Sequence, residues 1–319
     1  MKKTFTILTL LLLARFATAQ QPVQYSMYQL NKFAFNPAYA GLDNALMLTG
    51  VYRSQWVGLP GNPVSQNFNG HLPLGIIGGG AGITIDNETI GSWRQTAFSA
   101  SYAKHLAIGK TGLLSLGVGA GWVQRQLDGN KVRTPSDDPD TGASPDNYLP
   151  TGLEGGSGPT AQIGVFYQGE RLEAGISAVN LLGNKLDISG VNYEQERTYF
   201  LYLGYKLDLN RNFSAIPSIL LKTDVYQTQI DFSIKAQYNE NIFVGASFRG
   251  YHTNSLDAVA LIGGFKLTEK ISLAYAYDLG LSNLKSVSSG SHEVLLTYNI
   301  GGNIGKGRLP AIIYNPRSL

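Results

Sequence analysis

The chain has 319 residues, no cysteine, 38 glycines, 11% aromatic residues and only 15% charged residues. A soluble domain carries about 25% charged residues, so this composition is unlike that of an ordinary soluble protein and closer to that of a β-barrel wall. The lack of cysteine excludes disulfides and thiolate metal sites.

The first 19 residues have the pattern of a secretory signal peptide. Lys2 and Lys3 precede an apolar run, and the small residues 17–19 come directly before Gln20, so we expect cleavage between Ala19 and Gln20. The apolar run is shorter than the roughly 20 residues that a transmembrane helix needs. This disfavours the alternative, in which the segment stays as a membrane anchor.

Cleavage would also change the charge of the chain. It removes Lys2, Lys3 and Arg15 and no acidic residue, so the 25 basic and 22 acidic side chains become 22 of each. A neutral mature chain has no basic excess that would argue for a nucleic-acid partner. We therefore expect an exported protein that binds no nucleic acid.

Residues 20–44 form the next unit, an N-terminal periplasmic or plug segment. The part from Gln24 to Gly41 is irregular and interrupted by Pro37, so it cannot be a membrane-spanning strand. We expect it to fold into or beneath the periplasmic mouth of a barrel, with Trp56 on the opposite, outer side.

Residues 45–300 show the decisive pattern, an alternation of apolar and polar residues over segments of about ten residues. From Gln229 to Tyr238, the apolar residues Ile230, Phe232 and Ile234 alternate with polar ones. Because successive side chains of a strand point to opposite faces, one face would contact lipid and the other the lumen. The candidate lumen-facing residues are Asp231, Lys235, Arg249 and Glu293.

Fourteen such segments follow one another along the chain. They predict an all-β fold, a transmembrane antiparallel up-and-down β-barrel of about 14 strands and of the outer-membrane type. A soluble sandwich or propeller is the alternative, but its strands are shorter, about five or six residues. The predicted strands are 45–54, 64–72, 79–87, 93–106, 113–126, 160–168, 171–179, 197–208, 214–223, 228–238, 242–250, 257–267, 271–281 and 291–300.

The connections support an outer-membrane barrel, in which short periplasmic turns alternate with longer outer loops. Short turns are predicted near Gly109, Gly169 and Asn239, whereas the linkers Asp128–Gly158 and Leu182–Glu196 are long. An even strand count returns both ends of the barrel to the periplasm. The tail 301–319 contains two prolines and cannot add a strand. We expect it in the periplasm or folded back into the barrel mouth, where it is either docked against the lumen wall, docked onto a ring protein, or loose.

Motifs for chemistry are weak throughout. Gly109-Lys110-Thr111 resembles the end of a phosphate-binding loop, but it lacks the first glycine and lies at a predicted turn. His292 and Glu293 are adjacent, and a lumen-facing polar pair is the simpler interpretation. The acidic loop around Asp137 matches no calcium-loop spacing. We therefore predict no enzyme activity, no cofactor and no metal site.

Several sequence blocks resemble the PorP/SprF family of type IX secretion system outer-membrane proteins. Two blocks are the most specific, Gln24–Tyr28 leading to Asn36–Gly41, and Tyr52–Gly61 with its Gln55-Trp56 pair. The others follow in family order up to about residue 300. They are Asp86–Gly91, Gly175–Leu182, Pro217–Lys222, Tyr275–Asp278 and Gly290–Glu293.

This resemblance implies a non-enzymatic barrel that docks or anchors secreted proteins carrying a C-terminal sorting domain, such as surface adhesins of gliding motility, and aids their export. The implied partners are outer-membrane lipids, the secreted client and the periplasmic ring components of type IX secretion. The alternative is a passive channel for small or lipophilic solutes, which a plugged lumen would disfavour and a continuous polar pore would favour. Candidate partner-docking residues are Tyr25, Asn36, Pro37, Ala38, Gly41, Gln55 and Trp56.

Overall fold

The computed structural model describes residues 23–75, 77–132, 152–188, 190–224, 226–250 and 256–301. The predicted signal peptide with its cleavage site at Ala19-Gln20, most of the long loop before Gly158 and the tail after Gly301 lie outside these ranges. None of the helices in these ranges is long and apolar enough to cross a membrane.

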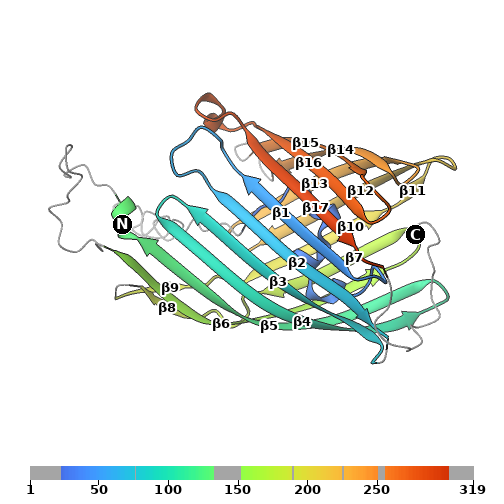
Figure 1. Ribbon diagram of the computed structural model, residues 1–319, viewed down its shortest axis with the longest axis horizontal. Coiled ribbons are helices and arrows are strands. Elements are labelled where there is room, and N and C mark those ends of the chain that lie inside the picture. Colours follow the sequence, from blue (N-terminus) through green and yellow to red (C-terminus); the bar gives the residue numbers. More distant parts are fainter. Residues whose placement is uncertain are drawn as a thin grey trace, which may run out of the picture.

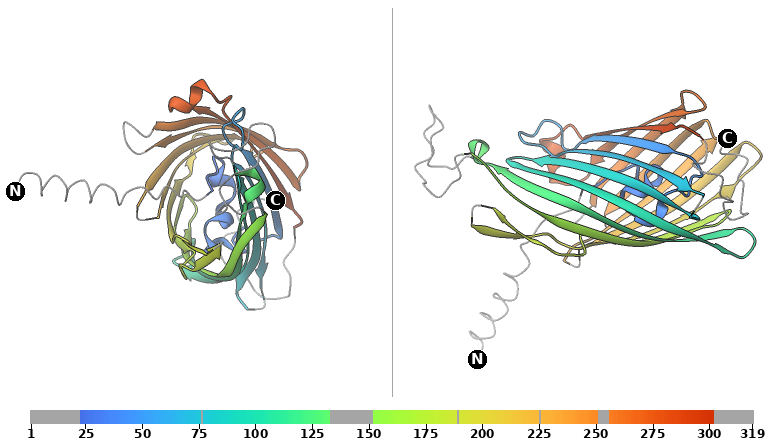
Figure 2. Two further views of the ribbon diagram at one scale, coloured as in Figure 1. Left: turned by 90° about the vertical axis from the view of Figure 1, so that its left-hand side faces the viewer. Right: turned by 60° about the horizontal axis from the view of Figure 1, so that its bottom comes forward.

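Fourteen antiparallel strands form a closed barrel, as the sequence predicts (Figures 1 and 2). β1 pairs with β17 and closes the sheet. β10 and β11 are separated only by Lys206 and count as one of the fourteen strands. The strands of the barrel are β1 (Met47–Ser54), β2 (Val64–Leu74), β3 (Gly79–Ile90), β4 (Trp93–Ile108), β5 (Gly112–Asp128), β6 (Leu153–Gln168), β7 (Leu172–Val179), β10 (Thr198–Tyr205), β11 (Leu207–Asp208), β12 (Phe213–Thr223), β13 (Thr228–Tyr238), β14 (Ile242–Gly250), β15 (Leu256–Lys266), β16 (Ile271–Gly280) and β17 (Ser291–Asn299).

The two ends of the barrel differ. At the turn end, where β1 begins and β17 ends, every connection is short, such as residues 109–111 between β4 and β5. At the loop end, where β1 ends and β17 begins, the connections are mostly longer, although only residues 91–92 join β3 to β4. If the turn end faces the periplasm, as in outer-membrane barrels generally, the end of the N-terminal segment at Leu46 and the end of β17 meet on that side.

The alternation of side chains follows the predicted register. In β13, Asp231 and Ser233 are 4% and 1% exposed, whereas Phe232 and Ile234 are 48% and 46% exposed on the outer face. β13 pairs with β14 so that Asp231 lies opposite Arg249. The outer face is therefore apolar and suited to lipid, while polar side chains point inward.

The wall is uneven in height. β4, β5 and β6 contain 16, 17 and 16 residues, whereas about 9–11 residues are enough for a tilted strand to cross the bilayer. β7 and β10 on the other side of β6 contain only 8 residues each. At the loop end, β5 and β6, here called the tall wall, therefore extend beyond β7, which pairs only with the part of β6 from Ile163 to Gln168.

Two parts of this region differ from the sequence prediction. β6 begins at Leu153, whereas the sequence predicted a start at residue 160. The prediction missed the first residues of the strand because their glycines and Pro159 have the composition of a loop. The linker Leu182–Glu196 contains a hairpin, β8 (Lys185–Ile188) and β9 (Val191–Glu194), which the sequence prediction missed. A four-residue strand is too short for alternation to identify it.

Replacing Phe232 by arginine tests the register of β13. A charged side chain on the lipid face near the midplane should lower the free energy of unfolding by about 2–4 kcal/mol. Denaturant titration of the barrel in lipid vesicles measures this difference. The control is Lys235→Arg, which keeps an inward charge, and equal stability of the two variants would contradict the register.

Candidate functional site

Residues 23–46, here called the plug, run through the lumen as an irregular chain (Figure 2). Its compact path consists of three short 3-10 turns, η2 (Tyr28–Leu30), η3 (Lys32–Ala34) and η4 (Pro37–Tyr39). Gln24 donates to Gln229 at 2.6 Å near the loop end, whereas Gly41 packs against residues 72, 73 and 80 near the turn end. The plug therefore passes along the lumen and is not confined to the periplasmic mouth.

The Asn-Pro-Ala block of the plug is adapted to a tight space. The Asn36 side chain accepts from Ala38 N at 2.9 Å and so caps η4, which begins with Pro37. The Asn36 amide also donates to the backbone oxygens of Val165 and Ile176, at 3.1 and 3.3 Å. One side chain thus caps the start of a turn of the plug and joins the plug to two strands.

Strand glycines make room for this block. A Cβ atom on Gly117 would lie 2.3 Å from Ala38 N, and one on Gly164 would lie 2.1 Å from the Asn36 side-chain oxygen. Real Cβ atoms essentially never approach so closely. The glycine-rich strand β5 therefore has no side chain where the plug backbone approaches it.

Aromatic residues fill the remaining space around the plug. Tyr39 of the plug meets Phe166 edge to face with ring centroids 5.0 Å apart, and Phe35 lies 6.0 Å from Tyr202. The Tyr28 hydroxyl donates to backbone oxygens of β12 and β13, and burial raises the pKa of Tyr28 to about 12, which keeps it protonated. The turn half of the lumen is therefore a packed core.

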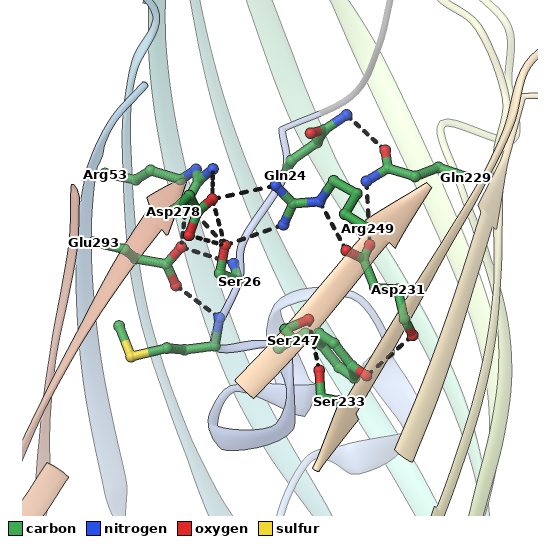
Figure 3. A network of polar contacts seen from close by, with 12 residues as sticks. Gln24, Ser26, Arg53, Gln229, Asp231, Ser233, Ser247, Arg249, Asp278 and Glu293 are labelled. Atoms are coloured by element: carbon green, nitrogen blue, oxygen red, sulfur yellow. Dashed lines mark hydrogen bonds and ion pairs between the residues drawn. The ribbon is translucent and has the colours of Figure 1, made fainter. Parts of the chain in front are cut away.

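Arg53 is the centre of a buried polar network that ties the plug to the wall (Figure 3). It is 1% exposed, and its guanidinium lies 2.6 Å from Asp278 and 2.9 Å from Glu293. Glu293 accepts from the backbone N–H groups of Ser26 and Met27 at 2.7 and 3.0 Å. The Ser26 hydroxyl donates to Asp278 at 2.8 Å.

Arg249 extends the network to β13. Its Nε lies 2.7 Å from Asp231, and its two Nη atoms lie 3.3 Å from Asp278 and 3.1 Å from the Ser26 hydroxyl (Figure 3). Two guanidinium groups therefore meet three carboxylates around one plug residue. Such a cluster is stable only while its charges stay paired, because each buried ion loses its hydration.

A second ion pair fixes the plug closer to the turn end. Lys32 of η3 lies 2.5 Å from Glu173 of β7. Burial disfavours the charge of Lys32, but the Glu173 carboxylate more than offsets this and holds the pKa of Lys32 above its usual range. The plug is therefore joined to opposite parts of the wall by charge-assisted hydrogen bonds.

Towards the loop end the plug leaves a cavity of about 540 Å³. Plug residues such as Tyr28 and Phe35 form part of its lining, together with charged residues of several strands, such as Glu88, Arg125 and Lys222. Arg125 lies between two aromatic rings, 4.7 Å from Trp93 and 3.9 Å from Tyr193 of β9, and donates to the Tyr193 hydroxyl. The β8–β9 hairpin is thereby attached to the cavity wall.

The predicted docking residues lie in different places. Asn36 and Ala38 are 1% and 0% exposed, and with Pro37 they pack inside the barrel instead of on an open surface. Gly41 adopts φ +79° in close contact with the backbone of Gly80. Tyr25 lines the cavity.

The Gln55-Trp56 pair follows β1 at the loop end, at the end of the barrel opposite Gly41. Gln55 is buried, and Trp56 is 38% exposed with φ +51°. The Trp56 N–H donates to the Ser291 hydroxyl at 3.1 Å, which joins this loop to β17. Trp56 is therefore the most accessible of the predicted docking residues.

The predicted lumen residues Asp231, Arg249 and Glu293 all belong to the buried network, whereas Lys235 lies apart from it, 5.4 Å from the Phe243 ring. Sequence reasoning missed Ser26, Arg53 and Asp278. Each lies in a block that marks the family resemblance, and Arg53 and Asp278 are charged residues of otherwise weakly charged strands. Charged residues within family blocks were therefore the signal from which the network could have been predicted.

Comparison with known proteins assigns the family. Residues 17–298 match the family described as Type IX secretion system membrane protein PorP/SprF. The chain belongs to the PorP/SprF family. It is an outer-membrane β-barrel related to type IX secretion, and membership implies interaction with components of that system. A search of curated proteins found no match.

Several solved structures are similar to this PorP/SprF barrel at low sequence identity. The CymD monoaromatic hydrocarbon channel is 13% identical, with 88% of this chain and 94% of that chain covered and a TM-score of 0.49. The Ralstonia pickettii toluene transporter TbuX is 12% identical, with 86% and 93% covered and a TM-score of 0.45. The Acinetobacter baumannii outer membrane protein Omp33 is 7% identical, with 80% and 98% covered and a TM-score of 0.46.

Replacing Arg53 by methionine tests the network. The change leaves Asp278 and Glu293 short of their main cationic partner, and the free energy of unfolding should fall by about 3–5 kcal/mol. Denaturant titration in vesicles measures it, and limited proteolysis should cut plug residues sooner than in the parent barrel. The control Arg94→Met, at an exposed position, should change stability by less than about 0.5 kcal/mol. Equal effects of the two changes would show that the network does not hold the plug.

Proposed function

We propose that this PorP/SprF barrel is a non-enzymatic docking or anchoring component of type IX secretion. In this proposal it binds secreted proteins that carry a C-terminal sorting domain, such as surface adhesins, and aids their export or surface retention. The observation that carries the proposal is the filled lumen. A barrel that does not conduct must act through its surfaces and its ends.

The plug contacts support this view over a passive channel for small or lipophilic solutes. Tyr28, Phe33, Ala38 and Tyr39 of the plug are buried in one cluster with wall residues such as Phe166. Packed apolar side chains of this kind leave few voids larger than a water molecule. The cavity near the loop end is bounded by the plug, so it resembles a blind pocket more than a pore.

The polar network supports a plug that stays in place. Moving the plug would separate Ser26 and Met27 from Glu293 and Asp278 and leave buried carboxylates without donors. Leaving a buried hydrogen-bonding group unsatisfied costs about 1–3 kcal/mol each, and more for charged groups. A fixed plug makes the barrel a rigid platform, which suits docking.

The remaining parts of the proposal concern the partners. The turn end, if periplasmic, would face the ring components of the machine. The loop end would face secreted clients outside the cell. Trp56 and the tall wall of β5 and β6 lie at that end.

Deletion of this chain tests the proposed function. We expect one or more large sorting-domain proteins to disappear from the cell surface or to change their distribution between surface and culture fluid, as measured by quantitative mass spectrometry of both fractions. Re-expression of the full chain should restore them. Unchanged secretion together with altered uptake of a small solute would favour the channel instead.

The filled lumen gives a separate prediction for the purified barrel. In planar bilayers the parent protein should show no steady open-pore current, because the turn half of the lumen is packed. Arg53→Met should add transient openings as the plug loosens, and the matched change Arg94→Met should not. A stable conductance of the parent barrel would contradict the plugged-lumen argument.

A further inference from the structure

Part of one edge of β6 is unpaired. β5 pairs with β6 along the whole stretch from Leu153 to Gln168, but β7 pairs only with the part from Ile163 to Gln168. Within the described ranges, no strand pairs with residues 153–162 on the side away from β5. This is where the tall wall projects above β7 at the loop end.

Two hydrogen bonds show which backbone groups of β6 point towards this edge. Leu181 N donates to Ala161 O at 3.0 Å, and the Asn184 side-chain amide donates to Pro159 O. Both donors come from the segment that follows β7, so odd-numbered residues of β6 direct their N–H and C=O groups away from β5. Leu153, Gly155 and Ser157 have the same phase and have no partner on that side in the described part of the chain.

The β8–β9 hairpin lies close to this edge without covering it. Leu186 of β8 packs near the inward positions of Gly156 and Gly158, where added Cβ atoms would lie 3.1 and 3.2 Å from Leu186 side-chain atoms. The hairpin therefore sits against the inner face of β6 and leaves the edge open. On the outer side, Gly155 has no side chain and Ser157 has a small one, so another strand has room to approach.

An open edge of this kind is unusual and lies in an accessible place. Proteins usually protect exposed edges with prolines, charges or covering segments, because free N–H and C=O groups bind other strands. Pro159 protects only its own position. Unpaired backbone groups would be very costly inside the hydrocarbon core of the bilayer. β6 is longer than a bilayer crossing requires, so its loop-end part extends out of that core into water. A protein partner can reach it there.

We propose that residues 153–157 of β6 bind an extended segment of the secreted client by β-strand addition. This rests on the proposed docking function and names its contact site. Backbone hydrogen bonds from Leu153, Gly155 and Ser157 would provide the affinity, as in other strand-addition complexes. Leu153, which is 63% exposed, would contact an apolar side chain of the added strand, and the small residues beside it require no particular sequence.

The variant Ser157→Pro tests the hydrogen bonds of this edge. Proline removes the N–H that faces the open edge, but β6 already accepts Pro159 in the same phase, so the ladder to β5 loses no donor. The control Ser157→Ala keeps the N–H. We expect client retained at the cell surface to fall about tenfold in Ser157→Pro, the effect of one lost backbone hydrogen bond with its steric block, and to stay unchanged in Ser157→Ala.

Site-specific photo-crosslinking tests the contact directly and does not depend on the proline variant folding. A photoreactive residue in place of Leu153, in the full chain in intact cells, should form an adduct with a sorting-domain protein. The same residue in place of Ile163, which has the same outward phase but is paired with β7, should not. The Leu153 adduct should persist in Ser157→Ala and disappear in Ser157→Pro.

Several outcomes would overturn the proposal. These are no client adduct at Leu153, equal adducts at Leu153 and Ile163, an adduct to residues 133–151 of the same chain, or an adduct to a second copy. The proposed function and this inference fail in different ways. If deletion of the chain leaves secretion unchanged, the docking function itself is wrong. If deletion removes the client but Ser157→Pro retains it at the parent level, only the strand-addition site is wrong.

Discussion

The contact between the Arg53 guanidinium and the Asp278 and Glu293 carboxylates is the interaction on which the interior of the barrel depends. It brings together side chains from β1, β16 and β17, the strands at which the sheet closes, and it positions the acceptors that hold Ser26 and Met27. A closed sheet satisfies its own backbone but leaves a lumen lined with polar groups. The plug supplies partners for those groups, so closure of the wall and folding of the plug stabilise each other.

The same arrangement explains why small residues occur where they do. Gly117 and Gly164 lack side chains at the points where Asn36 and Ala38 approach the wall. A larger residue on either strand would displace the plug, and a displaced plug would leave buried charges unpaired. Packing in the turn half and ion pairing near the loop end are therefore coupled through one short segment, which keeps the lumen closed.

The strands differ in length, and this difference creates the open strand edge at the loop end. The long strands β4, β5 and β6 line part of the cavity, and β6 has an open edge that the short strand β7 leaves exposed. Pairing rules that apply inside the bilayer are relaxed in water, where solvent satisfies free N–H and C=O groups. The part of the barrel that is free to bind a partner is thus the part that extends beyond the membrane.

Local patterns in the sequence determined the class of the fold, the fourteen strands and the inward direction of residues such as Asp231 and Arg249, because alternation within one strand decides which face each side chain occupies. The sequence blocks shared with the PorP/SprF family indicated that the chain belongs to it. The sequence could not show that Arg53 and Asp278, far apart in the chain, meet at Ser26, or that Asn36 is buried against strand glycines, since these contacts exist only after closure. It also gave no sign that β6 extends to Leu153, because glycine and proline there indicate a loop. Only the tertiary structure, through the neighbours that each strand has or lacks, decided which polar groups are paired within the protein and which remain open for a partner.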